Sequence, residues 1–526
     1  MNNGSTRPLV VQGDRSLLLE TSGPGFEDVR DHLLRFAELV KSPEYVHTYR
    51  ITPLSLWNAA ASGLSPAHVR EVLERYSRYP VPSNVLADVQ ELMGRYGRLS
   101  LKRQDGGLVL EAREAVDLAE VLRRREVQAF VVERLTPLSV LVRPEWRGHL
   151  KQALVRLGWP PEDLAGYQEG EHLPLGLRSV TRSGRPFQLR PYQEDAVRSF
   201  WAGGSPRGGC GVVVLPCGAG KTVVGMGVMA RASTSTLVIT TSTTALRQWR
   251  EELLDKAEIS PEAIGEYSGL EKEVRPITLT SYQILTHRTR RTEEFPHFRL
   301  FSQRGWGLII YDEVHLLPAP VFRITAELQA TRRLGLTATL VREDGREEDV
   351  FSLIGPKKHD VPWKDLERQG WIAAAVCHEL RLPLPMDQRW RYAEADVADR
   401  HRVAAENPAK LGLVERLVES HRGDHILVIG RFLTQLEQLS RTLAAPLITG
   451  QTPQRKREQL YQQFRDGAIP VLVLSEVGNF AVDLPDANVA IQVSGRFGSR
   501  QEEAQRLGRV LRPKPGANQA HFYSVV

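Results

Sequence analysis

Short apolar runs, separated by longer stretches of helical periodicity, dominate the C-terminal part of the chain. The runs are continuous rather than alternating, which is typical of strands buried on both faces of a parallel sheet. Strands that alternate with helices predict doubly wound α/β domains whose site lies at the carboxyl ends of the strands. One series of predicted strands is 211–215, 235–240, 277–281, 307–311 and 334–339, and a second is 425–430, 446–449, 471–474 and 489–493.

The N-terminal part has a different pattern. Residues 9–12 and 16–20 predict a hairpin, and 26–40 a helix. Thr52-Pro53 and Ser65-Pro66 are helix-start pairs that predict helices over about 53–62 and 66–78, with another over about 84–96. A further hairpin at 99–102 and 108–111 completes the order of a winged helix, giving a first domain of 1–115. This order fits DNA contact and protein docking equally well.

Residues 116–177 predict a small α+β domain with strands at 129–133 and 139–142 and a helix over about 144–158. Trp146, Lys151, Arg156 and Trp159 interleave aromatic and basic side chains, a pattern that can clamp nucleic acid. From composition alone, core tryptophans with solvated charges are the better explanation.

Composition narrows the class of protein. The 526 residues suffice for three or four domains, and the net charge of +6 with a pI near 9.2 is compatible with nucleic acid without requiring it. Cys210, Cys217 and Cys377 have no paired spacing, so neither a disulfide framework nor a zinc site is expected. With no signal sequence and no long apolar window, we expect a soluble cytoplasmic protein without membrane contact.

The segment from Leu215 to Thr222 reads Leu-Pro-Cys-Gly-Ala-Gly-Lys-Thr and stands between a predicted strand and a predicted helix. A glycine-rich turn at a helix N-terminus directs N–H groups at phosphate. Gly218 and Gly220 would form the turn, Lys221 would reach the outer phosphates, and the Thr222 hydroxyl would ligate Mg²⁺. The segment therefore predicts ATP and Mg²⁺ binding.

Hydrolysis of ATP also needs a metal-holding carboxylate, an oriented water and positive charge. Asp312 and Glu313 end a predicted apolar strand, where Asp312 can hold Mg²⁺ and Glu313 can orient and deprotonate the water. Gln193, one short helix before the glycine-rich turn, could read adenine. Arg509 and Arg512, on a predicted final helix of the second series, would supply charge from another domain, an effect worth roughly 10³ to 10⁵ in turnover.

Taken together, these motifs resemble those of superfamily 2 helicases, and finer features resemble the XPB branch in its prokaryotic form. The resemblance rests on Gly218-Ala-Gly-Lys-Thr222, Asp312-Glu-Val-His315, Thr337-Ala-Thr339, Arg342-Glu343-Asp344 and Gln505-Arg-Leu-Gly-Arg509-Val-Leu-Arg512. It implies two RecA-like motor domains, 178–370 and 371–526, preceded by small α+β domains, of which 116–177 would be damage-recognition-like. A thumb-like insertion would fall at about 386–409.

The same resemblance implies ATP-dependent unwinding of DNA with 3′–5′ polarity in DNA repair. It also implies single-stranded or forked DNA as partner and a nuclease as a repair partner. Coupling of the cleft to unwinding would involve Thr337, Thr339, Arg342, Glu343, Asp344, Gly478, Asp483 and Gln505. The candidates for DNA contact are Thr241, Ser242, Trp249, Ser281 and Trp390, although the residues at strand ends could equally be helix caps. Two alternatives stay open: a duplex translocase, and an ATPase-switch subunit of a larger complex.

Overall fold

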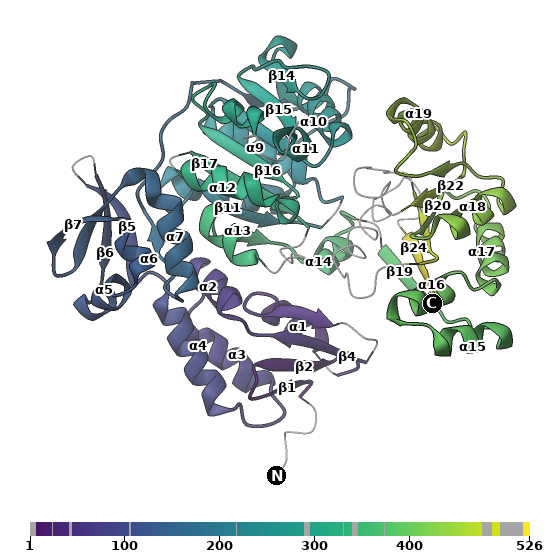
Figure 1. The fold of residues 1–526 in the computed structure, drawn as a ribbon, viewed down its shortest axis with the longest axis horizontal. Helices are drawn as coiled ribbons and strands as arrows, with labels where there is room; N and C mark the ends of the chain where they lie inside the picture. Colours follow the sequence, from purple (N-terminus) through teal and green to yellow (C-terminus); the bar gives the residue numbers. More distant parts are fainter. Residues whose placement is uncertain are drawn as a thin grey trace. The chain divides into compact units, whose positions relative to one another are not determined.

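The computed structural model describes residues 7–23, 25–41, 45–104, 107–216, 218–288, 295–329, 331–338, 346–372, 374–475, 487–494 and 519–526. The chain forms two compact units. The first comprises Met1–Val214, Val223–Thr240 and Arg250–Asp360, and the second comprises Leu215–Thr222, Thr241–Trp249 and Val361–Val526. Figure 1 labels many of their elements.

The N-terminal part of the first unit packs a four-stranded antiparallel sheet, in the order β1-β2-β4-β3, against helices. The predicted caps are confirmed: the N–H of Ser55 donates to Thr52 Oγ1 (3.0 Å), and the N–H of His68 donates to Ser65 Oγ (3.2 Å). Its elements are β1 (Leu9–Val11), β2 (Ser16–Glu20), α1 (Phe26–Leu33), β3 (Glu38–Lys41), β4 (Val46–Arg50), α2 (Pro53–Ala61), α3 (Pro66–Tyr76) and α4 (Ser83–Arg95).

The single helix predicted over 26–40 is wrong in its second half. α1 ends at Leu33, and Glu38–Lys41 instead forms β3, which pairs with the edge of β4. An unpaired strand edge leaves N–H and C=O groups without partners. Pairing with that edge outweighs the helical pattern of a short segment, because most helical stability in proteins comes from tertiary packing rather than from local preference.

The hairpin predicted at 99–111 does not complete a winged helix. Its strands β5 (Leu99–Gln104) and β6 (Gly107–Ala112) join the next sheet, whose order is β7-β8-β6-β5-β9. Leu101 and Leu110 of the hairpin are fully buried in the core of that sheet. The other elements here are α5 (Ala115–Leu122), α6 (Arg125–Gln128), β7 (Val131–Thr136), β8 (Ser139–Val142), α7 (Arg147–Arg156) and β9 (Glu162–Asp163).

The aromatic and basic side chains of this second part are divided between core and surface. Trp159 is 5% exposed and belongs to the core, and Lys151 is buried against Asp163. Trp146 is partly exposed, and the side chain of Arg156 is exposed. The structure therefore places Trp159 in the core as expected, whereas the charge of Lys151 is buried and paired rather than solvated.

A parallel sheet of seven strands, in the order β14-β15-β12-β16-β17-β11-β18, forms the remainder of the first unit. This confirms the predicted doubly wound fold, and β14 and β18 are additions to the predicted strands. The strands are β11 (Cys210–Val214), β12 (Thr236–Thr240), β14 (Ile264–Tyr267), β15 (Ile277–Ser281), β16 (Leu308–Asp312), β17 (Arg332–Thr337) and β18 (Lys357–Asp360). The connecting elements include α8 (Pro191–Trp201), α9 (Lys221–Ala232), α10 (Thr243–Lys256), α11 (Tyr282–Leu285), α12 (Ala319–Glu327) and α13 (Glu347–Leu353), with a small pair of β10 (Gly176–Leu177) and β13 (Ala257–Glu258).

The small N-terminal parts pack directly on this sheet's helices and edge. α7 lies against α12 and α13 (Figure 1). Trp57, Val155 and Phe351, one residue from each part, form a shared apolar cluster. The Asn58 side chain accepts the N–H of Lys357 on β18 at 2.8 Å, so that the edge strand of the large sheet is met by the N-terminal helix α2.

The second unit contains a parallel sheet of six strands in the order β19-β24-β23-β20-β22-β21. Four of these strands are predicted, and β19 and β24 are not. The elements are α14 (Trp363–Arg368), β19 (Ala374–Leu380), α15 (Met386–Glu394), α16 (Val397–Ala405), α17 (Ala409–Ser420), β20 (Ile426–Gly430), α18 (Leu433–Thr442), β21 (Leu447–Ile448), α19 (Gln454–Arg465), β22 (Val471–Ser475), β23 (Val489–Gln492) and β24 (Gln519–Val525). Among the described residues, no helix has the length and apolarity needed to cross a membrane.

Candidate active site

The predicted phosphate-binding turn connects β11 to α9. β11 ends at Val214, and α9 begins at Lys221, so Lys221 and Thr222 occupy the first turn, where backbone N–H groups lack helical partners. Gly218 and Gly220 have φ of 78° and 81°. Side chains other than glycine adopt this left-handed conformation at a cost of about 1–2 kcal/mol, which explains glycine at both positions. The donors suit a polyanion such as the phosphates of ATP.

The predicted acidic pair lies at the same edge of the same sheet. β11, β17 and β16 run parallel in that order, with Val214 beside Thr337 and Asp312 beside Leu336. The carboxyl ends of β11 and β16 are therefore two strand spacings apart, about 10 Å. The end of β11 and Asp312 thus lie at the same edge of the sheet.

Glu313 has an unusual backbone conformation, with φ 50° and ψ 54° in the left-handed region. Its N–H donates to Asp312 Oδ1 at 3.0 Å. Its carboxylate Oε2 lies 3.5 Å from Nδ1 of His315. The same nitrogen, Nδ1 of His315, lies 2.7 Å from Thr337 Oγ1. The structure thus brings Glu313, the buried His315 and Thr337 into one polar cluster.

His315 is a site residue to which the sequence motif alone assigned no role. Its position three residues after Asp312 was visible, but its contact with Thr337 joins two strands that are distant in the chain. Only the parallel pairing of β16 with β17 shows that the imidazole connects the two motifs.

Gln193 is buried in the first turn of α8, and its Oε1 accepts the N–H of Arg190 at 3.0 Å. The side-chain oxygen thus serves as a helix cap. The contact of Gln193 with adenine stays a prediction.

The candidates for DNA contact have different surroundings. Ser242 Oγ accepts the N–H of Ala245 (3.2 Å), and Ser281 Oγ accepts that of Ile284 (3.4 Å), so both are helix caps, while Thr241 is half-buried just before α10. Trp390 on α15 is 70% exposed and available for stacking.

Trp249 is a candidate for DNA contact whose side chain is buried, and its role stays a prediction. It is only 1% exposed, and it shares the buried face of α10 with Leu246 and Leu253. Positions separated by three and four residues lie on the same face of a helix, so this ring is part of the core beneath α10.

Nine predicted site residues lie outside the described residues, so their contribution stays a prediction. They are Thr339, Arg342, Glu343, Asp344, Gly478, Asp483, Gln505, Arg509 and Arg512.

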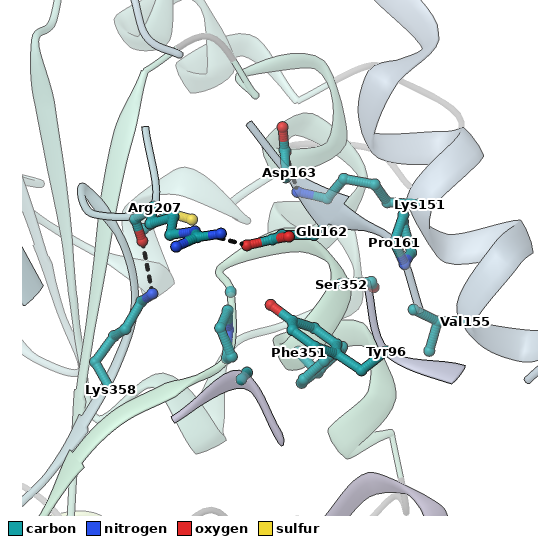
Figure 2. Close-up of a pocket in the computed structure, with 14 residues that line it drawn as sticks. Tyr96, Lys151, Val155, Pro161, Glu162, Asp163, Arg207, Phe351, Ser352 and Lys358 are labelled. Atoms are coloured by element: carbon teal, nitrogen blue, oxygen red, sulfur yellow. Dashed lines mark hydrogen bonds and ion pairs between the residues drawn. The ribbon is translucent and has the colours of Figure 1, made fainter. Parts of the chain in front are cut away.

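A pocket lies at the opposite end of β11, where the strand begins at Cys210 (Figure 2). Arg207 donates to Glu162 at 3.0 Å, and Lys358 Nζ donates to the carbonyl of Arg207 at 2.7 Å. Lys151 faces Asp163 on its far wall. Because Arg207 and Lys151 are paired with carboxylates and Lys358 donates to a backbone carbonyl, the pocket is better explained as a junction between the parts of the first unit than as a reaction site.

Comparison with known protein families gives three matches along the chain. Residues 366–526 match the family described as ERCC3/RAD25/XPB C-terminal helicase. Residues 186–342 match the res subunit of type III restriction enzymes, and residues 9–136 match a helicase conserved C-terminal domain.

Similar proteins extend over almost the whole chain. A protein of Kineococcus radiotolerans named DNA 3′-5′ helicase XPB is 54% identical over 520 residues, covering 99% of this chain and 91% of the relative. One of the same name from Mycobacterium tuberculosis is 51% identical, with 99% and 92% covered. The general transcription and DNA repair factor IIH helicase/translocase subunit XPB of Antonospora locustae is 35% identical, with 99% and 77% covered.

Proposed function

We propose that this chain hydrolyses ATP to unwind DNA with 3′–5′ polarity, because it belongs to the XPB family of DNA 3′-5′ helicases. The observation that carries the proposal is the meeting of two motifs at one edge of the seven-stranded sheet. The left-handed glycine turn follows β11, and Asp312 and Glu313 end β16, which is joined to β11 through β17. This is where doubly wound folds bind their ligands.

In this proposal, each residue near the sheet edge has a separate task. Lys221 and the N–H groups of the first turn of α9 bind the phosphates, while Thr222 and Asp312 hold Mg²⁺. Glu313 orients the attacking water and accepts its proton. When bound, ATP would supply the phosphoanhydride that is cleaved, and Mg²⁺ would neutralise part of the charge of its phosphates.

His315 and Thr337 connect the acidic pair to the end of β17. Because Thr337-Ala-Thr339 leads toward Arg342-Glu343-Asp344 in the sequence, this contact is a plausible start of the coupling between hydrolysis and unwinding. Arg509 and Arg512 complete the proposal as the donors of positive charge to the transition state.

On DNA, we expect backbone contacts from hydroxyl and N–H groups at the strand ends, including Thr241, Ser242 and Ser281. Trp390 would add base stacking. A repair role is supported by the repair-factor name of the Antonospora relative, and a nuclease is the repair partner that we propose.

ATPase and strand-displacement assays with the whole chain test the proposal. We expect DNA to stimulate ATP turnover and a duplex with a 3′ tail to be unwound in preference to one with a 5′ tail. Glu313→Gln should abolish turnover while ATP binding survives, because the amide keeps the shape but cannot accept the proton. Equal turnover with and without DNA, or no tail preference, would count against it.

A second candidate function is translocation along duplex DNA without strand separation. It is favoured by the word translocase in the name of the Antonospora relative. Displacement of the third strand of a triplex, without unwinding of a tailed duplex, would identify a translocase. If Lys221→Ala leaves biological function intact, the ATPase is a switch in a larger complex rather than a motor.

A further inference from the structure

The peptide group between Asp312 and Glu313 is fixed at both of its polar atoms. Its N–H donates to Asp312 Oδ1 at 3.0 Å, and its carbonyl oxygen accepts the hydroxyl of Tyr282 at 2.9 Å. Rotation of this peptide plane would change ψ of Asp312 and φ of Glu313 together. The two hydrogen bonds therefore determine the direction in which the Glu313 side chain leaves the backbone.

These two hydrogen bonds act on a residue with an unfavourable backbone conformation. Glu313 is left-handed, a conformation that costs a residue with a side chain about 1–2 kcal/mol and persists only when its surroundings hold it. Tyr282 is suited to hold it, because the ring is 4% exposed and belongs to the apolar core that also contains Tyr311 and Val314.

Tyr282 reaches Asp312 from another strand end. It is the first residue of α11 and directly follows Ser281, the last residue of β15 and a candidate for DNA contact. In the sheet, β12 lies between β15 and β16. The Tyr282 hydroxyl therefore extends past the end of β12 to reach the end of β16.

The end of β15 is itself held in place. Thr280 Oγ1 donates to the carbonyl of Tyr267 at 2.9 Å, and the carbonyl of Thr280 accepts Thr240 Oγ1 from β12 at 3.1 Å. A displacement of this strand end would move the Tyr282 hydroxyl with it.

We propose that Tyr282 is a positioning residue for ATP hydrolysis, whose hydroxyl fixes the Asp312–Glu313 peptide and connects the end of β15, which carries the candidate Ser281, to the Glu313 carboxylate. The inference rests on the proposed function and adds a residue that the motif pattern does not identify. Misplacement of a reacting group by about 1 Å costs about a hundredfold in rate.

Tyr282→Phe tests the inference, because it removes the hydroxyl and keeps the ring. We expect kcat of the DNA-stimulated ATPase to fall about tenfold to a hundredfold. The KM for ATP, the affinity for a non-hydrolysable ATP analogue and the unfolding temperature should change little, since the phosphate-binding turn and the core are untouched.

Tyr311→Phe is the matched control. Tyr311 is fully buried in the same core, and its hydroxyl is 3.0 Å from Thr325 Oγ1 rather than at the acidic pair. This variant should keep kcat within about twofold, since it removes a comparable hydrogen bond that does not involve the Asp312–Glu313 peptide.

The possible outcomes separate the two proposals. Wild-type kcat in Tyr282→Phe overturns the positioning role, and so does an equal fall of kcat and unfolding temperature in both tyrosine variants. If the wild-type protein shows no ATP turnover, the proposed function itself fails. A selective loss of kcat in Tyr282→Phe, with Glu313→Gln inactive, supports both.

Discussion

Replacing Asp163 by asparagine should loosen the attachment of the second N-terminal part to the large sheet. The Asp163 carboxylate is buried and accepts Arg147 Nη2 at 2.6 Å and Lys151 Nζ at 2.9 Å. Burial opposes its ionisation, but Lys151 and Arg147 together hold the pKa of Asp163 below its ordinary value. Lys151 Nζ also donates to Gln329 Oε1 at 2.7 Å, just beyond α12, so the pair spans the junction.

The magnitude follows from what asparagine leaves behind. A neutral amide leaves two cations without their counter-charge, and both side chains are about 4% exposed. Breaking a buried pair in this way costs about 3–5 kcal/mol. Because native stabilities are about 5–15 kcal/mol, this loss should be visible in any unfolding measurement.

Urea unfolding followed by tryptophan fluorescence, together with hydrogen exchange of α7, measures the effect. Glu91→Gln is the control, because it breaks the exposed i,i+4 pair of Glu91 with Arg95, and it should cost about 0.5 kcal/mol or less. The paired replacement Lys151→Met with Asp163→Leu should recover part of the loss, since it leaves one buried cation, Arg147, without its counter-charge instead of two.

The pH dependence supplies an independent check. A carboxyl whose pKa is lowered on folding stabilises the protein above its unfolded pKa of about 4, and that stability is lost as pH falls through the lower, folded pKa. The wild type should therefore lose stability relative to Asp163→Asn below about pH 4. A change of less than about 0.5 kcal/mol in Asp163→Asn at neutral pH, or an equally unstable double variant, would refute the reasoning.

Three further predictions follow from other parts of the chain. Gly148→Ala should make α7 sensitive to limited proteolysis, because the added Cβ would lie 2.7 Å from the Ala326 Cα, whereas Gly94→Ala, with nothing within 4 Å, should not. Burial lowers the pKa of Lys410 from 10.5 to about 8, and its Nζ donates to the carbonyls of Val493 and Val525. As pH rises, the folded protein therefore releases this proton at a lower pH than the unfolded chain does. The free energy of unfolding should consequently rise between pH 8 and 10.5. In urea unfolding, the wild type should gain up to about 3 kcal/mol over Lys410→Met across that range, and a constant difference would contradict this. Trp390→Ala should weaken single-stranded DNA binding by about 1–3 kcal/mol in a fluorescence titration with no change in unfolding, and unchanged affinity would exclude stacking by this ring.

The sequence by itself determined the features that depend on near neighbours in the chain. Continuous apolar runs identified the central strands of both sheets, and Thr52 and Ser65 marked helix starts that the structure confirms. Gly218 and Gly220 were expected in a turn, and both have positive φ. The buried face of α10 was also readable, since Leu246, Trp249 and Leu253 have helical spacing, and this signal should have assigned Trp249 to the core.

Tertiary structure alone decided which segments pair and which side chains meet. The strands β18, β19 and β24 form against edges supplied by distant segments, and the hairpin at 99–111 joins the sheet that follows it. The contacts of His315 with Thr337 and of Tyr282 with Asp312 join residues at or just after the ends of different strands. Local sequence sets the preference of a segment, but buried backbone groups must find partners wherever the folded chain offers them, and that requirement acts between residues far apart in sequence.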